Sequence, residues 1–228
     1  MSSGELGQNT KKSLLWYTLL PFLVHILRFA GSIVLARILT PEDFGVISII
    51  SILFFYSNTF TDFGLANALV QRRNVTRVHY GTVFVFNLTI SLILFVLFQL
   101  FAIEVSIYYG VPILDPVLRV FSFIFIISSF MAVPTAYLRR HVRFKAIAVI
   151  ETVRVLAAIV VSLWMAKLGF GVWSMVYAML LSQILGALLL ILTSEIKLVL
   201  TCSLVALKQL FNFSLWSFLN LQFLLISE

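Results

Sequence analysis

The chain has 228 residues, of which 61% are hydrophobic and 11% charged, and its mean hydropathy is +1.09. Soluble domains are about a quarter charged, so the composition excludes a soluble globular enzyme, a disordered protein and a disulfide-rich secreted domain. The formal net charge is +7. Because basic residues accumulate in the cytoplasmic loops of membrane proteins, this charge does not require a nucleic-acid partner, and we expect none. Because one membrane span takes roughly 20 residues, the length predicts an all-α, polytopic transmembrane helix bundle of about seven spans.

Seven hydrophobic segments follow one another along the chain, separated by polar or helix-ending residues. They are Ser13–Ala36, Phe44–Ala66, Tyr80–Ile103, Pro116–Leu138, Ala146–Ala166, Val172–Thr193 and about Val205–Ile226. This pattern divides the chain into three parts. Residues 1–12 form a cytoplasmic leader, residues 13–194 a six-helix N-terminal transmembrane bundle, and residues 195–228 a cytoplasmic connection and a seventh span, in or just after which the sequence ends.

Several loops carry residues that favour helix starts and turns. In Thr40-Pro41-Glu42-Asp43, the threonine can cap a helix, the proline fits the first turn, and two acids meet the positive end of the helix dipole. Asp115-Pro116 predicts a second helix start, and Gly169-Phe170-Gly171 predicts a tight connection. These loops mark the same boundaries as the hydrophobic segments.

Basic residues divide cleanly between alternate loops. On one side of the membrane lie the leader and the second, fourth and sixth loops. With Lys208, which follows the sixth loop, their basic residues are Lys11, Lys12, Arg72, Arg73, Arg77, Arg139, Arg140, Arg143, Lys145, Lys197 and Lys208. The other side has Arg37, Arg119 and Lys167, offset by Glu42, Asp43, Glu104 and Asp115. Because basic loops stay in the cytoplasm, we predict a cytoplasmic N-terminus. The basic loops also suit anionic lipid headgroups or recruitment of an anionic substrate.

Ionisable residues inside spans usually face a cavity or one another, because exposure to lipid is costly. His25 and Arg28 lie three residues apart on the first span and therefore share a face, which Ser32 continues. Two interpretations remain open for this stripe. It is a site for the phosphates of a substrate, or Arg28 reaches towards the membrane surface or an acid elsewhere while His25 serves packing.

Three more charged residues lie in their spans towards the side that is predicted to be cytoplasmic. Asp62 follows a run of small polar residues that could line an inner vestibule, and Glu151 and Arg154 lie three residues apart on the fifth span. Glu151 and Arg154 form a self-contained ion pair, or they belong to a gate in which Asp62 and Arg154 pair across the bundle.

Catalytic motifs are missing from the sequence. It has no glycine-rich phosphate loop, no serine nucleophile elbow and no metal-ligand spacing, since His25, His79 and His141 are far apart. We therefore expect no catalytic residues, no metal and no cofactor, and a protein that is not an enzyme.

Four loop motifs resemble one family. Leu35–Gly45 (LARILTPEDFG) and Thr61–Arg73 (TDFGLANALVQRR) look like the first outer loop and the following segment of Wzx-type polysaccharide and lipopolysaccharide flippases. Leu138–Lys145 and Leu168–Trp173 are similar to that family's fourth and fifth loops. The family belongs to the multidrug/oligosaccharidyl-lipid/polysaccharide export superfamily, and its colanic-acid exporter branch is the most similar.

The resemblance implies a transporter that moves undecaprenyl-pyrophosphate-linked oligosaccharide units from the inner to the outer leaflet by alternating access. It implies a bacterial inner-membrane location and a role in exopolysaccharide or lipopolysaccharide biosynthesis, with Arg28 and Asp62 handling the substrate head. The implied partners are the lipid-linked oligosaccharide, membrane lipids, the polysaccharide polymerase and assembly proteins, and a second half-transporter.

Family members have about 12 to 14 spans, arranged as two bundles. Because this sequence predicts about seven, the resemblance implies a fragment or half-unit that corresponds to the N-terminal bundle and the start of the second. Two alternatives remain open, namely an integral-membrane glycosyltransferase or polymerase and a non-transporting scaffold of the polysaccharide assembly machinery.

Overall fold

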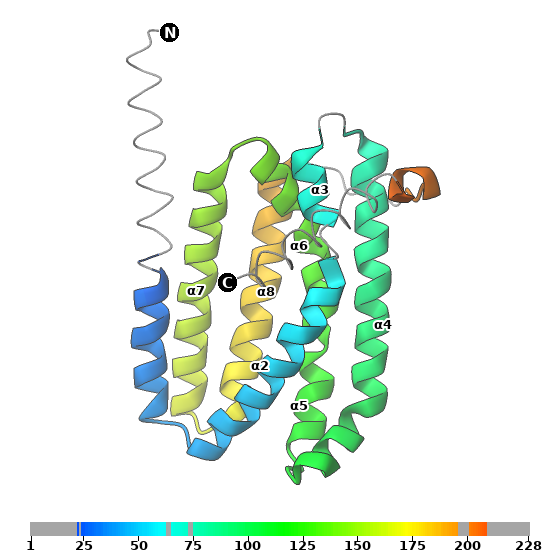
Figure 1. Cartoon of the computed structure of the whole chain (residues 1–228). Helices are drawn as coiled ribbons and strands as arrows, with labels where there is room; N and C mark the ends of the chain where they lie inside the picture. Colours follow the sequence, from blue (N-terminus) through cyan, green and yellow to red (C-terminus); the bar gives the residue numbers. More distant parts are fainter. Residues whose placement is uncertain (1–21, 23, 63–64, 73–74, 196–200, 209–228) are drawn as a thin grey trace, which may run out of the picture.

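The computed structural model describes residues 22, 24–62, 65–72, 75–195 and 201–208, which form an up-and-down bundle of α-helices (Figure 1). Helix Val24–Ala36 comes first. It is followed by α2 (Pro41–Asp62), α3 (Leu65–Gln71), α4 (Arg77–Tyr109), α5 (Leu114–Phe121), α6 (Phe123–Arg140), α7 (Phe144–Lys167) and α8 (Val172–Ser194). The described residues contain no strand, and the prediction of an all-α membrane bundle is confirmed.

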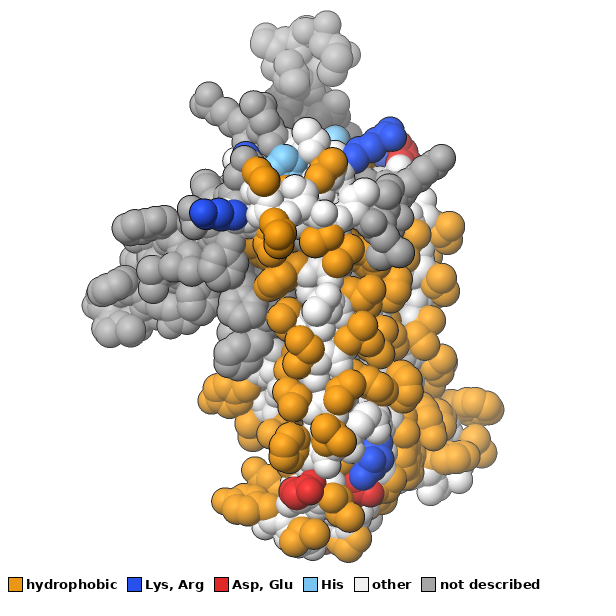
Figure 2. All heavy atoms as spheres, turned by 90° about the vertical axis from the view of Figure 1, so that its right-hand side faces the viewer, with side chains coloured by type: hydrophobic (Ala, Val, Ile, Leu, Met, Phe, Trp, Pro, Cys, Tyr) orange, Lys and Arg blue, Asp and Glu red, His pale blue; other side chains and the backbone are white. Residues whose placement is uncertain are grey.

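Four stretches of the described chain are long and apolar enough to cross a membrane. They are Arg77–Tyr109, Leu114–Arg140, Phe144–Lys167 and Val172–Ser194, and they contain the predicted third to sixth spans. Figure 2 shows one long side of the bundle covered by apolar side chains, with charged side chains gathered at its two ends. This distribution suits a lipid-facing surface between two water-facing rims.

The structure describes only part of the predicted N-terminal and C-terminal segments. The leader at residues 1–12 and most of the predicted seventh span lie outside the described residues, although residues 204–208 are helical. Of the first span, the structure describes Phe22 and residues 24–36.

Successive membrane-spanning segments run in opposite directions, with α5 and α6 continuing in one direction as a single segment, so the loops alternate between the two ends (Figure 1). The connections after α3 and α6, which carry the predicted basic loops, lie at one end, called here the basic end. The connections before α2, α5 and α8 lie at the other end, called here the acidic end. This arrangement agrees with the alternation that the loop charges require, while the cytoplasmic side of the basic end stays a prediction.

The predicted fourth span is not one regular helix. It divides into α5 and α6 at Ser122, where the Gln99 side chain of α4 donates hydrogen bonds to the Arg119 carbonyl (2.9 Å) and to Ser122 Oγ (3.0 Å). In return, the Arg119 guanidinium donates to the Gln99 carbonyl (2.9 Å). A contact from a neighbouring helix therefore accompanies the break, and the span starts at Leu114 rather than at Pro116.

The apolar core has a cluster at each end of the bundle. At the acidic end, Ile50 of α2 and Phe121 of α5 pack with Val176 of α8, and all three are buried. At the basic end, Leu69 of α3 packs with Val83 of α4.

Asp43 joins the starts of two helices at the acidic end. Thr40 Oγ1 accepts a hydrogen bond from the Asp43 backbone N–H (3.3 Å), and Asp43 Oδ2 accepts one from the Thr40 backbone N–H (3.1 Å). This reciprocal cap confirms the helix start predicted at Thr40. Asp43 Oδ1 also accepts from the backbone N–H of Val172, the first residue of α8 (2.9 Å).

Arginines of the predicted basic loops make specific contacts at the basic end. Arg140 of α6 donates to the carbonyl oxygens of Leu69 (2.8 Å) and Arg72, at the C-terminal end of α3. Arg143 forms an ion pair with Glu195 just after α8 (3.1 Å). These side chains therefore tie loops to helix ends, besides any contact with lipid.

Candidate functional site

Helix Val24–Ala36 lies close against α7 because of Gly31. A Cβ atom at Gly31 would lie 3.1 Å from Cγ1 of Ile159 on α7, which leaves no room for a larger side chain without a shift. Arg28 lies one turn earlier on the same face of this helix and is thereby directed towards α7.

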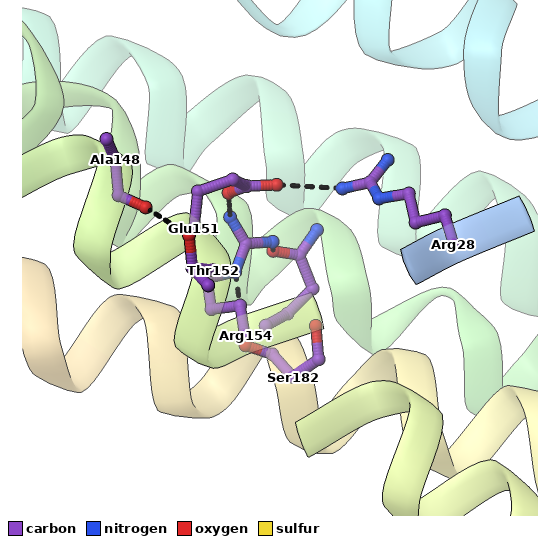
Figure 3. Close-up of polar contacts among 7 residues, drawn as sticks. Arg28, Ala148, Glu151, Thr152, Arg154 and Ser182 are labelled. Atoms are coloured by element: carbon purple, nitrogen blue, oxygen red, sulfur yellow. Dashed lines mark hydrogen bonds and ion pairs between the residues drawn. The ribbon is translucent and has the colours of Figure 1, made fainter. Parts of the chain in front are cut away.

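Arg28, Glu151 and Arg154 form one ion cluster (Figure 3). Arg28 Nη2 lies 2.8 Å from Glu151 Oε1, and Arg154 Nη1 lies 2.7 Å from Glu151 Oε2. The two arginines approach the carboxylate from two different helices, and each binds a different oxygen. We call these three residues the charge cluster.

Arg154 is also anchored to α8. Its Nε donates to the Ser182 carbonyl (3.3 Å), and its Nη2 donates to the Gln183 side-chain oxygen. The side chain crosses α8 at Gly186, where a Cβ atom would collide with Cδ and Nε of Arg154. Gly186 therefore provides the space that lets Arg154 reach Gln183.

The charge cluster carries excess positive charge, because two guanidinium groups share one carboxylate. The side chain of Arg154 is 17% exposed, whereas that of Arg28 is 55% exposed. Arg28 is therefore the more accessible cation, and an anionic group that approached it would balance the excess charge.

The charge cluster lines a cavity of about 380 Å³ between helix Val24–Ala36, α7 and α8. Its wall also includes Ser32, Ser162, Ser182 and Gln183, together with apolar side chains such as Phe54 and Met179. We call this the first cavity. A volume of this size is within the range of ligand-binding sites.

A second cavity of about 300 Å³ lies towards the basic end. Its lining includes Asn87, Ser128, Thr135 and Arg139, and it shares Phe54, Arg154 and Gln183 with the first cavity. These three shared residues come from α2, α7 and α8 and separate the two cavities. Within the described ranges, no three His, Cys, Asp or Glu side chains are close enough to hold a metal ion.

The structure brings three of the five predicted site residues together. Arg28 joins the predicted pair of Glu151 and Arg154, so this pair is not self-contained. His25 is exposed, and it lines neither cavity. Asp62 is the last residue of α2, and its side chain is outside what the structure describes.

Sequence reasoning missed the polar residues that complete the site. Gln183 and Ser182 lie in the middle of an apolar span, where an amide or hydroxyl is a signal for contacts between helices. Asn87 gives the same signal on α4. These neutral side chains carry no charge and therefore give a weaker signal in the sequence than Arg28, Glu151 and Arg154.

The fold and the site together define a class, an α-helical membrane protein of several spans with a charge cluster and polar cavities in its interior. A family profile described as "Polysaccharide biosynthesis protein" matches residues 34–227. The chain belongs to this family, and the resemblance to Wzx-type polysaccharide flippases is confirmed.

Three curated relatives give the match more detail. The chain is 28% identical over 148 residues to a protein of Klebsiella pneumoniae named "Uncharacterized membrane protein in cps region". It is 24% identical over 153 residues to the lipopolysaccharide biosynthesis protein WzxC of Escherichia coli K12. It is 29% identical over 160 residues to the succinoglycan biosynthesis transport protein ExoT of Rhizobium meliloti.

The matched regions cover 65%, 67% and 69% of this chain and 30%, 31% and 32% of these relatives, in the same order. The chain therefore spans about a third of the length of the curated relatives that it matches. No solved structure matches it.

Proposed function

We propose that this chain is part of a transporter that moves undecaprenyl-pyrophosphate-linked oligosaccharide units from the inner to the outer leaflet of the bacterial inner membrane. The movement serves surface polysaccharide biosynthesis and proceeds by alternating access. Family membership and two relatives named for lipopolysaccharide biosynthesis and succinoglycan transport support this proposal. The basic end faces the cytoplasm in this proposal, as the loop charges predict.

The observation that carries the proposal is the charge cluster at the first cavity. A pyrophosphate is strongly anionic, and the excess positive charge and exposure of Arg28 suit it. Binding of phosphate to Arg28 would compete with Glu151 for the same guanidinium, so substrate arrival loosens the contact between helix Val24–Ala36 and α7. A shift of these two helices is the kind of change that alternating access needs.

Arg154 suits a gate between the two cavities, because it belongs to both linings. In the proposed gate, Asp62 and Arg154 pair across the bundle when the cytoplasmic side is closed. Asp62→Arg and Arg154→Asp should each impair export, and the charge-swapped double variant should restore it in part. Failure of the double variant to improve on either single variant would count against the gate.

The proposal is tested by deleting the whole gene in its native strain and measuring two quantities. Surface polysaccharide should be lost, and complete lipid-linked oligosaccharide should accumulate with its sugar on the cytoplasmic side. An integral-membrane transferase or polymerase would instead leave incomplete units or unpolymerised units at the outer surface. Unchanged surface polysaccharide would overturn the proposal.

Complementation separates a transporter from a scaffold. The full-length gene carrying Arg28→Ala should fail to restore export, whereas Arg28→Lys should restore part of it, since a cation is retained. Export at the wild-type level with Arg28→Ala and Asp62→Ala would favour a scaffold that binds the polymerase and other assembly proteins.

A further inference from the structure

The second cavity contains a buried amide that no described residue satisfies. Asn87 lies on α4 and lines this cavity, and its side chain is fully buried. Neither its Nδ2 nor its Oδ1 has a hydrogen-bond partner among the described residues. A buried amide without partners is destabilising by about 1–3 kcal/mol, so its presence calls for a role beyond packing.

The chemistry around Asn87 indicates a ligand rich in hydroxyl groups. An amide offers a donor and an acceptor side by side, which matches a hydroxyl group that both donates and accepts. Ser128 and Thr135 add two hydroxyl groups to the same lining, and Gln183 adds a second amide. Among the described residues, the lining contains no carboxylate.

The second cavity differs from the first cavity in the charged residues that line it. Arg139 and Arg154 are the charged residues in the part of its lining that the structure describes, and Arg154 is already bound to Glu151, Ser182 and Gln183. Four neutral hydrogen-bonding residues, one of them Asn87, line this cavity together with six apolar residues, while the accessible cation Arg28 lies in the first cavity.

We infer that the second cavity binds the sugar of the lipid-linked substrate through Asn87, separately from the phosphate site at Arg28. The inference rests on the proposed function. It divides recognition between two neighbouring cavities, with sugar hydroxyl groups held towards the basic end and pyrophosphate held at the charge cluster. Asn87 is then a specificity-determining residue for the saccharide.

The test uses purified full-length protein in lipid nanodiscs and native mass spectrometry with three probes. These are undecaprenyl pyrophosphate, the same lipid carrying one hexose, and phosphatidylglycerol, whose glycerol headgroup also offers hydroxyl groups. Asn87→Leu keeps the branching and the number of side-chain heavy atoms but cannot form hydrogen bonds. It should weaken binding of the hexose-bearing probe about tenfold, the effect expected for one or two buried hydrogen bonds, and change the other two probes less than about twofold.

Ser91→Ala is the matched control. Ser91 lies one turn after Asn87 on α4, is fully buried, and has a hydroxyl group without a partner among the described residues, but it does not line the second cavity. Its replacement should leave binding of all three probes unchanged. Thr135→Val provides a second test on α6 and should weaken only the hexose-bearing probe.

Thermal unfolding distinguishes a sugar-binding role from a structural one. Asn87→Leu should unfold at the wild-type temperature or above it, because it removes an unsatisfied buried amide. If Asn87→Leu does not accumulate as folded protein, this expectation is wrong and the amide is structural. Thr135→Val then tests whether the cavity itself binds sugar.

Other outcomes separate this inference from the function on which it rests. If the wild type binds neither undecaprenyl probe, the proposed function fails and the inference fails with it. If the wild type binds both but Asn87→Leu changes neither, or weakens both equally, only the inference is overturned. An equal loss for phosphatidylglycerol would assign the cavity to a glycerol headgroup and overturn the sugar assignment.

Discussion

At the acidic end of the bundle, Asp43 accepts hydrogen bonds from the backbone starts of α2 and α8, whereas farther along the bundle Glu151 is shared by two arginines from two helices. These N–H groups are part of the helix starts, so the bond between Val172 and Asp43 breaks only if the start of α8 moves relative to α2. The guanidinium groups at Glu151 end flexible side chains and can exchange one anion for another. A carboxylate bound to helix ends therefore makes a fixed joint, whereas a carboxylate bound to side chains makes a contact that a ligand can open.

The largest effect is expected from Glu151→Gln, which leaves Arg28 and Arg154 without their shared carboxylate. Breaking a buried ion pair costs about 3–5 kcal/mol, and the 38% exposure of the Glu151 side chain places this variant towards the lower end. Thermal unfolding in detergent should shift downwards, and surface polysaccharide should fall in a complementation assay. Glu151→Asp should lose less of both.

Glu104→Gln is the matched control for this change, because Glu104 is an exposed acid on α4 near the acidic end. It should leave unfolding and export unchanged. Equal losses of stability and export in the Glu104 and Glu151 variants would show that Glu151 has no special role in joining the two arginines.

The next effect is expected from Gly186→Ala, which displaces the Arg154 side chain from α8. The new methyl group would collide with Cδ and Nε of Arg154, and overpacking of this kind costs about 1–3 kcal/mol. The bonds to Ser182 and Gln183 should be lost, so export should fall together with the unfolding temperature.

Gly45→Ala is the counterpart of Gly186→Ala in α2. A Cβ atom at Gly45 meets nothing within 4 Å, and alanine favours a helix over glycine by about 1 kcal/mol. This variant should raise the unfolding temperature and keep export. A loss of stability in both variants would show that space for Arg154 is not what Gly186 provides.

Much of the fold could be predicted because the signals were local. The predicted spans Ala146–Ala166 and Val172–Thr193 differ from α7 and α8 by two residues or fewer at each end, since glycines and charges mark their limits. The cap at Thr40 was readable for the same reason. The break at Ser122 was not readable, because its hydrogen bonds come from Gln99 on another helix.

The residues of the charge cluster could be predicted from the sequence, but the ion pair that joins two of its helices could not. Arg28, Glu151 and Arg154 stood out as charges within spans, yet Arg28 and Glu151 are 123 positions apart in sequence. Their meeting depends on the close approach of two helices at Gly31, which no local pattern describes. Asn87 was not predicted as a site residue, because a neutral amide within an apolar span carries no charge.

A smaller effect is expected from Asp43→Ala, which removes the fixed joint. Loss of a helix cap costs about 0.5–2 kcal/mol, and Asp43 accepts bonds from both Thr40 and Val172. The unfolding temperature should fall, while the affinity for undecaprenyl pyrophosphate should stay at the wild-type level. Glu42→Ala, the neighbouring acid in the first turn of α2, should lower stability less. A loss of affinity with unchanged stability would place Asp43 in the binding machinery instead.

The smallest effect is expected from Arg143→Gln, which breaks the ion pair with Glu195 at the basic end. The side chains of Arg143 and Glu195 are 44% and 67% exposed, and exposed pairs contribute about 0–1 kcal/mol that salt screens further. A double-mutant cycle with Glu195→Gln should therefore give a coupling below about 1 kcal/mol that decreases between low and high salt. The same cycle for Arg28→Gln and Glu151→Gln should give a larger coupling that salt changes less, because Glu151 is also held by the less exposed Arg154. Equal couplings would mean that Glu151 behaves as a surface charge, and the first cavity would then lack a protected ion contact for a phosphate to displace.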